Sequence, residues 1–293
     1  MTSAAGPSPR LLVRDAVAVL ASAGVASPEA DAVTLLAAVL GVERSRLPLI
    51  DVVSDVDRER FTTLLARRAA REPLQHLTGR AYFRHVELAV GPGVFVPRPE
   101  TELLAGWAIE ALRTVSAPAG PDGAGAPVVV DLCTGSGAIA RSLADEVPLA
   151  RIYAVELDPA AHGWAERNLA GTGVDLRQGD MAHAVDELAG TVDVITCNPP
   201  YIPWEAWESV AVEARDHDPH LALFSGDDGL DAIRVVEDVA ARLLRPGGVV
   251  GFEHADAQGE SAPAVFVQAG RWTEVRDHAD LAGRPRYTTA RLR

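Results

Sequence analysis

Lysine is absent from this sequence and cysteine is scarce, with only Cys133 and Cys197 among its 293 residues. Two cysteines without a Cys-x-x-Cys pair argue against a disulfide framework and against a structural zinc site. No run approaches the ~18–20 consecutive apolar residues of a membrane span. The first ten residues also lack the apolar core of a secretory signal. We therefore expect a cytoplasmic protein that uses no metal and has no membrane partner.

Basic residues are few compared with acidic ones. The chain has 27 basic residues, all of them arginine, against 41 acidic ones, for a net charge of −14. This balance argues against stable nucleic-acid binding, which depends on neutralising phosphates. A chain of 293 residues with 48% hydrophobic content can form one large or two modest domains, and we expect it to act as a monomer.

Hydrophobic periodicity divides the chain into three parts. Apolar residues recur at helical spacing over residues 11–24, 29–41 and 56–71, which predicts a helical domain over 1–80. Residues 81–96 read as a hairpin or extended connection and 99–113 as a helix, so residues 81–115 form a connection. A low-complexity loop over 116–127 opens the remaining domain, residues 116–293.

Short apolar runs alternate with helical segments in this third part. The expected strands cover residues 127–132, 151–156, 174–178, 192–197 and 248–254. The expected helices cover 138–146, 160–170, 182–189 and 229–244, and a final antiparallel pair fits 272–277 and 287–292. This alternation predicts an α/β fold, with a parallel sheet covered by helices on both faces.

The segment from Asp131 to Ala140 reads as strand, glycine loop and helix. Glycines allow a sharp turn close to a ligand, and a helix N-terminus favours an anionic group. Glu156 ends the next strand and suits ribose hydroxyls, while Asp180 and Met181 follow the third strand and suit an adenine ring. The loop also fits the dinucleotide fingerprint G-x-G-x-x-A, so a nicotinamide or flavin dinucleotide stays possible. The proposed contacts are Asp131, Cys133, Thr134, Gly135, Ser136, Gly137, Glu156, Asp180 and Met181.

The tetrapeptide Asn198-Pro199-Pro200-Tyr201 follows the fourth strand. Two prolines stiffen the turn and hold Asn198 extended. A planar NH2 group can then donate to the Asn198 side-chain oxygen and to the Pro199 carbonyl, with the Tyr201 ring packed on it. That arrangement directs the nitrogen lone pair toward an electrophile, and together with Asp131 and Asp180 it favours S-adenosylmethionine as cofactor. The alternative interpretation is a rigid turn with a core tyrosine.

With these motifs, nearly the whole chain resembles the release factor glutamine methyltransferases, the HemK-like or PrmC family. The resemblance rests on Glu72 to Gly79, Val96 to Glu102, Asp131 to Gly137, Cys197 to Ile202, His217 to Leu223 and Phe252 to His254. It implies a Rossmann-like class I S-adenosylmethionine-dependent methyltransferase sheet with an N-terminal helical substrate-binding domain. It also implies methylation of the side-chain amide nitrogen of the glutamine in the Gly-Gly-Gln loop of peptide chain release factors.

The resemblance also assigns roles to residues. It implies that Cys133 to Gly137, Glu156, Met181 and Asn198 contact the cofactor. Asn198, Pro199 and Tyr201 are the expected catalytic residues, and Pro200 and Arg98 join them as candidates for substrate binding. Arg98 has a second interpretation, in which it pins its own segment. The family usually has glycine at the position of Cys133 and an aromatic residue at that of Met181.

Three other functions are compatible with these motifs. The same turn can hold a glutamine of a ribosomal protein or the exocyclic amine of adenine in nucleic acid. A catalytically silent binding module that keeps the fold is the third. The acidic charge disfavours nucleic acid, and the Pro-Arg-Pro-Glu-Thr-Glu segment, residues 97–102, favours the release factor.

Overall fold

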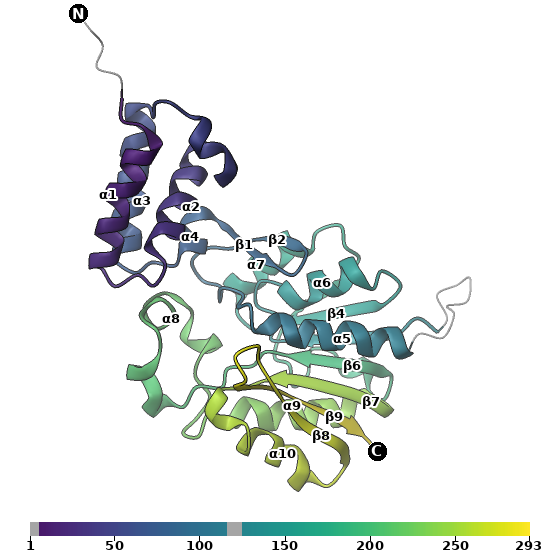
Figure 1. Ribbon diagram of the computed structural model, residues 1–293. Helices are drawn as coiled ribbons and strands as arrows, with labels where there is room; N and C mark the ends of the chain where they lie inside the picture. Colours follow the sequence, from purple (N-terminus) through teal and green to yellow (C-terminus); the bar gives the residue numbers. More distant parts are fainter. Residues whose placement is uncertain (1–5, 116–124) are drawn as a thin grey trace, which may run out of the picture. The chain divides into compact units, whose positions relative to one another are not determined.

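The computed structural model describes residues 6–115 and 125–293, and the chain divides into two compact units (Figure 1). The helical unit comprises Met1–Arg80 with Ala211–His217, and the α/β unit comprises Ala81–Val210 with Asp218–Arg293. Residues 116–124 of the expected low-complexity loop lie outside the described residues.

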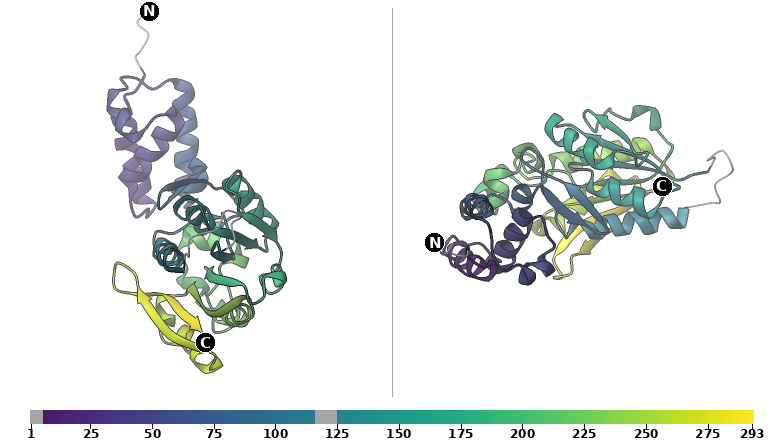
Figure 2. Two further views of the ribbon diagram at one scale, coloured as in Figure 1. Left: turned by 90° about the vertical axis from the view of Figure 1, so that its right-hand side faces the viewer. Right: turned by 90° about the horizontal axis from the view of Figure 1, so that it is seen from above.

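Three long helices build the helical unit, and Figure 2 shows them side by side. Ser8 and Ser54 cap two of them by accepting backbone N–H groups, and Gly41, with φ of 63°, ends the third. Each lies within two residues of the helix expected from periodicity. The elements are α1 (Pro9–Ser22), α2 (Pro28–Leu40), the 3-10 helix η1 (Arg44–Leu49), α3 (Asp55–Ala69) and α4 (Leu74–Thr78). Their buried core includes Leu20, Leu35, Leu36 and Phe61.

A short helix from far along the sequence, α8 (Val212–His217), completes this unit. Its Glu213 carboxylate accepts hydrogen bonds from Arg71 at 2.7 and 2.8 Å and from Arg68 at 3.1 Å. Arg68 is buried and also donates to Asp31 at 2.7 Å. Burial raises the pKa of Glu213, but the hydrogen bonds from Arg71 and Arg68 outweigh burial and lower that pKa to about 2. Charged hydrogen bonds therefore tie α8 to α3.

Replacing Glu213 with glutamine is expected to destabilise the helical unit by about 1–2 kcal/mol at neutral pH. The amide keeps the shape of the side chain but offers one acceptor oxygen to two guanidinium groups. Because the folded-state pKa of about 2 lies below the ordinary 4.5, the carboxylate stabilises fully above pH 4.5. Its contribution is lost as the pH falls toward 2.

Calorimetric unfolding of wild type and Glu213→Gln at pH 7 and pH 3 measures this difference. Glu208→Gln, at an exposed glutamate, is the matched control and should unfold like wild type. A deficit in Glu213→Gln that is equally large at both pH values would contradict the proposed role of the ionised carboxylate.

The α/β unit is built on a seven-stranded sheet with the order β5-β4-β3-β6-β7-β9-β8. The first five of these strands are parallel neighbours, whereas β9 pairs antiparallel with both β7 and β8. The strands are β3 (Val128–Leu132), β4 (Arg151–Glu156), β5 (Asp175–Gln178), β6 (Val192–Cys197), β7 (Leu244–Glu253), β8 (Trp272–Ala279) and β9 (Pro285–Leu292). The expected parallel sheet with a terminal antiparallel pair is confirmed.

Helices cover both faces of this sheet, as Figure 1 shows. Successive residues of a strand point to opposite faces, so Val129 packs against one helical layer and Val130 against the other. One layer contains α5 (Thr101–Val115), α6 (Ala138–Glu146) and α7 (Pro159–Leu169). The other contains α9 (Asp231–Leu243) and α10 (Ser261–Ala269). Burial on both faces explains why β3 and β6 are apolar throughout much of their length.

The helix expected over residues 182–189 is wrong. Only the 3-10 turn η2 (Asp186–Leu188) forms there. Val185 has φ of −138° and is buried in the core under β3 and β6, so packing of its side chain interrupts the helix. Upstream, the Asp180 carboxylate accepts the backbone N–H of Ala182 and favours a turn.

Two further elements complete the unit. The connection before α5 contains the hairpin of β1 (Arg80–Phe83) and β2 (Val86–Ala89). Helix α10 was not expected from the sequence, and Pro263 lies in its first turn, where a missing N–H costs no helical hydrogen bond.

Within residues 6–115 and 125–293, no helix has the length and apolar character needed to cross a bilayer.

Candidate active site

The proposed site residues gather at one edge of the sheet. Leu132 of β3 is paired with both Val155 of β4 and Cys197 of β6, so these parallel strands end side by side. The chain continues from β3 to β4 on one side and returns to β6 on the other, which makes this edge the topological switch point where ligands bind in such folds. The structure therefore brings the glycine loop, Glu156 and Asn198 to adjacent strand ends.

The glycine loop contains left-handed backbone conformations, which are unfavourable for residues with a Cβ. Gly135 and Gly137 have φ of 58° and 82°, and Cys133 has φ of 53°. A left-handed conformation costs a residue with a Cβ about 1 kcal/mol, which explains why glycine suits the position of Cys133. The Cys133 side chain packs on the core beneath β3, with its Sγ 3.7 Å from Met181 Sδ. Open space borders Gly135, where an added Cβ would meet no heavy atom within 4 Å.

Asp131 lies beneath the loop. Its carboxylate is 1% exposed and accepts hydrogen bonds from Thr134 Oγ1 at 2.6 Å and Thr196 Oγ1 at 2.8 Å. Burial raises the pKa of Asp131 to about 6, although both threonine hydroxyls oppose the rise. Asp131 therefore connects the glycine loop to β6, and its hydrogen bond from Thr134 fixes the Thr134 side chain. The cofactor contact expected of Asp131 stays a prediction, and the enclosed carboxylate has its own role in holding the loop.

Glu156 connects the glycine loop to the start of α7. Its Oε2 accepts the N–H of Gly135 and its Oε1 accepts the N–H of Asp158, each at 2.8 Å. Burial raises the pKa of Glu156, and the backbone donors of Asp158 and Gly135 partly offset this. Each carboxylate oxygen keeps a second lone pair, so acceptors remain for ribose hydroxyls.

Asp180 and Met181 follow β5, in line with the sequence expectation. Asp180 is exposed and Met181 half-buried against the same core cluster as Cys133. Sequence reasoning missed Asn168, whose side chain bonds Ala89 through both its oxygen and its nitrogen and donates to the Ser136 carbonyl at 2.8 Å. No motif marked Asn168, because its partners lie on separate elements.

The turn after β6 is held by a buried polar network. Asn198 Nδ2 donates to Thr101 Oγ1 at 3.3 Å, and the Tyr201 hydroxyl donates to Glu253 Oε1 at 3.1 Å. Burial raises the pKa of Tyr201, and the negative charge of Glu253 adds to the rise. Pro199 is buried and Pro200 partly so. Thr101 and Glu253 both lie in segments that carry the family resemblance, yet no role was expected for either.

The segment that follows the Asn198–Tyr201 turn is held in place by a short β-bridge. Ile202 pairs with Phe224, and the backbone N–H groups of Tyr201 and Ile202 both donate to the Leu223 carbonyl. Trp204 stacks on Phe224 with ring centroids 4.8 Å apart. The aromatic packing and the bridge anchor the Asn198–Tyr201 turn at its downstream end.

Arg98 forms an ion pair inside the α/β unit. Its guanidinium donates to Asp218 Oδ2 at 2.8 Å and lies over the Phe95 ring. Burial raises the pKa of Asp218 to about 6, although the charge of Arg98 opposes the rise. This pair ties the segment before α5 to the segment that follows α8, which agrees with a structural role for Arg98.

Replacing Arg98 with alanine is expected to destabilise the α/β unit by about 2 kcal/mol at pH 7.5, because Asp218 becomes a buried, unpaired charge. A carboxyl with a raised folded-state pKa binds its proton more tightly when folded, so folding gains stability as the pH falls. The deficit should therefore shrink at pH 5, below the value of about 6 for Asp218. Thermal unfolding at the two pH values measures it.

The double variant Arg98→Ala/Asp218→Asn separates the two interpretations of Arg98. It should recover most of the lost stability, since the buried charge is gone. A purely structural Arg98 predicts recovered turnover as well. A stable double variant with a raised KM for the substrate would instead show that Arg98 contacts the substrate.

The sheet order, the glycine loop after β3 and the acidic residues at the end of β4 and after β5 define a class I S-adenosylmethionine-dependent methyltransferase. A methyltransferase domain family matches residues 129–217, and the PrmC N-terminal domain family matches residues 12–79. The chain is 57% identical over 273 residues to the release factor glutamine methyltransferase of Streptomyces coelicolor, covering 93% of this chain and 94% of that protein. It belongs to the release factor glutamine methyltransferase family.

Two other relatives show the breadth of this similarity. The release factor glutamine methyltransferase of Mycolicibacterium smegmatis is 46% identical over 283 residues, covering 96% of each chain. A 4-amino-L-phenylalanine/4-methylamino-L-phenylalanine methyltransferase of Streptomyces pristinaespiralis is 42% identical over 273 residues, covering 93% of this chain and 92% of that protein.

Proposed function

We propose that this protein methylates the side-chain amide nitrogen of the glutamine in the Gly-Gly-Gln loop of peptide chain release factors. The observation that carries the proposal is the position of Asn198 at the end of β6, directly beside the strand that leads into the cofactor loop. Family membership over almost the full length of the chain supports it.

The residues present fit S-adenosylmethionine. Glu156 offers acceptors for the ribose hydroxyls, Asp180 an acceptor for the adenine amino group, and Met181 an apolar side chain for the ring. Thr134 to Gly137 supply backbone groups beside the open space at Gly135. When bound, the cofactor supplies a methyl group already activated by its sulfonium, so no metal is needed.

The turn residues act on the acceptor nitrogen. An amide nitrogen is a poor nucleophile because its lone pair is shared with the carbonyl. The Asn198 side-chain oxygen and the Pro199 carbonyl accept its two hydrogens and orient the lone pair, a contribution of proximity and orientation. The Tyr201 ring packs beside the amide, with its hydroxyl anchored on Glu253.

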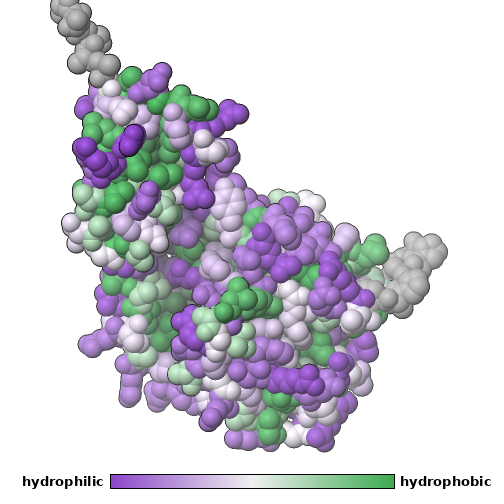
Figure 3. Space-filling model, viewed as in Figure 1, coloured by the Kyte–Doolittle hydropathy of each residue, from purple (hydrophilic) through white to green (hydrophobic). Residues whose placement is uncertain are grey.

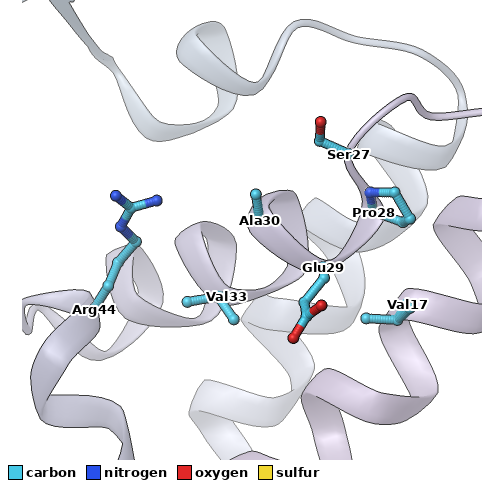
Figure 4. Close-up of a pocket in the computed structure, with 7 residues that line it drawn as sticks. All are labelled: Val17, Ser27, Pro28, Glu29, Ala30, Val33 and Arg44. Carbon is cyan, nitrogen blue, oxygen red and sulfur yellow. The ribbon is translucent and has the colours of Figure 1, made fainter.

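The helical unit is the proposed site of contact with the body of the release factor. Apolar side chains gather on its surface, as Figure 3 shows, and Leu49 and Val56 are 80% and 59% exposed. A shallow cavity of about 610 Å³ lies over α1, α2 and η1, where Val17, Ala30 and Val33 line it together with the charged Glu29 and Arg44 (Figure 4). Exposed apolar surface of this kind marks protein contact sites. A release-factor substrate also places the reaction in the cytoplasm, and one chain carries every proposed site residue, so a monomer suffices.

The test is methyl transfer from labelled S-adenosylmethionine to purified release factor, compared with the release factor whose loop glutamine is alanine. Label in the first and none in the second is the expected result. Ribosomal protein and DNA are added as separate acceptors, since a glutamine of a ribosomal protein and adenine are the alternative substrates. No transfer to any acceptor and no heat on titration with S-adenosylmethionine would indicate a silent binding module.

A second candidate substrate comes from the relative in Streptomyces pristinaespiralis, which is named for methylation of an aromatic amine. The lone pair of an arylamine is also delocalised, so the same turn suits it. The higher identity to the release factor enzymes favours glutamine. Incubation with 4-amino-L-phenylalanine tests the candidate directly.

A further inference from the structure

A buried chain of hydrogen bonds leads from the catalytic turn to the end of β7. Asn198 Nδ2 donates to Thr101 Oγ1 at 3.3 Å, and Thr101 Oγ1 donates to Glu253 Oε2 at 2.6 Å. The Tyr201 hydroxyl donates to the other Glu253 oxygen at 3.1 Å. Thr101 and Glu253 are 4% and 2% exposed. The bond between Thr101 and Glu253 is therefore shielded from water.

The direction of each bond follows from the geometry of the donors and acceptors around Glu253. An ionised carboxylate only accepts hydrogen bonds. Burial raises the pKa of Glu253, and the Thr101 hydroxyl, the positive charge of Arg286 and the Tyr201 hydroxyl only partly offset that rise. Both carboxylate oxygens accept a hydroxyl group, Oε2 from Thr101 at 2.6 Å and Oε1 from Tyr201 at 3.1 Å. The Thr101 hydroxyl therefore donates its hydrogen bond to Glu253 and cannot donate one to Asn198. Only the lone pairs of Thr101 Oγ1 are left for Asn198.

This leaves one favourable orientation for the Asn198 amide. Its NH2 group must face Thr101, because the opposite orientation sets the carbonyl oxygen against another oxygen that has no proton to donate. The Asn198 Oδ1 atom consequently points away from Thr101 and takes no part in these hydrogen bonds. A free acceptor there is what the NH2 group of a substrate glutamine requires.

We infer that Thr101 and Glu253 are positioning residues, which hold the Asn198 amide with its oxygen available to the substrate nitrogen. The inference rests on the proposed function. It assigns a role to the Pro-Arg-Pro-Glu-Thr-Glu segment, whose Thr101 lies 97 positions before Asn198 in the sequence. Thr101 acts through Asn198 and touches no reacting atom itself.

The test begins with Thr101→Val, which removes the hydroxyl and keeps the shape of the side chain. We expect kcat to fall about tenfold, because the amide then turns freely, while KM for release factor stays within twofold of wild type. Thr101→Ser should restore kcat, since serine keeps the hydroxyl. Thr114→Val, at an exposed threonine of the same helix, is the matched control and should behave as wild type.

A double-mutant cycle with Asn198→Ala separates positioning from general support of the fold. In the Asn198→Ala background, Thr101→Val should lower kcat no further, because the group it positions is gone. A further tenfold loss would overturn the inference. Where Thr101→Val does not fold, Thr101→Cys replaces it, since a thiol is a weak donor and acceptor, and the same cycle applies.

The two possible failures remain distinguishable. Wild-type protein that does not methylate release factor would overturn the proposed function. Wild-type protein that methylates release factor, together with Thr101→Val at normal kcat, would overturn the positioning role alone.

Discussion

Replacing Asn198 with alanine is expected to lower kcat for methyl transfer on the order of 10²-fold or more. In the proposed function, the side-chain oxygen of Asn198 is one of two acceptors that orient the substrate amide, and alanine leaves only the Pro199 carbonyl. Asn198 is partly exposed at the end of β6, so its removal leaves no large cavity and the fold should persist. The loss should therefore appear in turnover and only slightly in thermal stability.

Single-turnover methyl transfer to release factor measures this effect without a contribution from product release. Titration calorimetry with S-adenosylmethionine serves as the control, since the variant must still bind the cofactor. Near-normal turnover with intact cofactor binding would contradict the proposal that Asn198 holds the substrate nitrogen. A variant that loses only cofactor binding would instead show that Asn198 contacts the cofactor and does not align the substrate amide.

The second large effect is expected at Glu156, where alanine should weaken binding of S-adenosylmethionine about 10²-fold. The carboxylate accepts the backbone N–H groups of Gly135 and Asp158, so its removal leaves both donors without their partner and loosens the glycine loop. The acceptors proposed for the ribose hydroxyls are lost as well. Both effects act on the cofactor before any substrate binds.

Calorimetric titration of wild type and Glu156→Ala with S-adenosylmethionine checks this expectation. Glu166→Ala, at an exposed glutamate of α7, removes the same charge outside the site and should leave the affinity unchanged. Since burial raises the pKa of Glu156, wild-type affinity should begin to fall at a higher pH on acidification than it would for an exposed glutamate. Equal affinity in wild type and Glu156→Ala would exclude Glu156 from the cofactor site.

Much of the site could be predicted because parallel strands bring their carboxyl ends to one edge. Once β3, β4 and β6 were recognised as parallel neighbours, the residues that follow them had to meet, whatever their spacing in the sequence. That reasoning placed Glu156, Asp180 and Asn198 at one edge. It does not determine whether a strand-end side chain such as that of Asp131 faces the ligand, because that direction depends on register and packing. Helical periodicity predicted a helix over residues 182–189, and that prediction is wrong because burial of Val185 prevails there.

The class of fold, the cofactor loop and the stiff Asn-Pro-Pro-Tyr turn could be predicted from the sequence, because backbone preferences and alternating apolar runs are local properties. The groups that hold that turn in place are set by long-range packing in the folded chain. Thr101 and Glu253 reach Asn198 and Tyr201 from a helix start and a separate strand end, and Glu213 joins the helical unit through arginines more than 140 positions away. Such pairings arise where the folded chain leaves a buried donor facing a buried acceptor, and no local pattern records them.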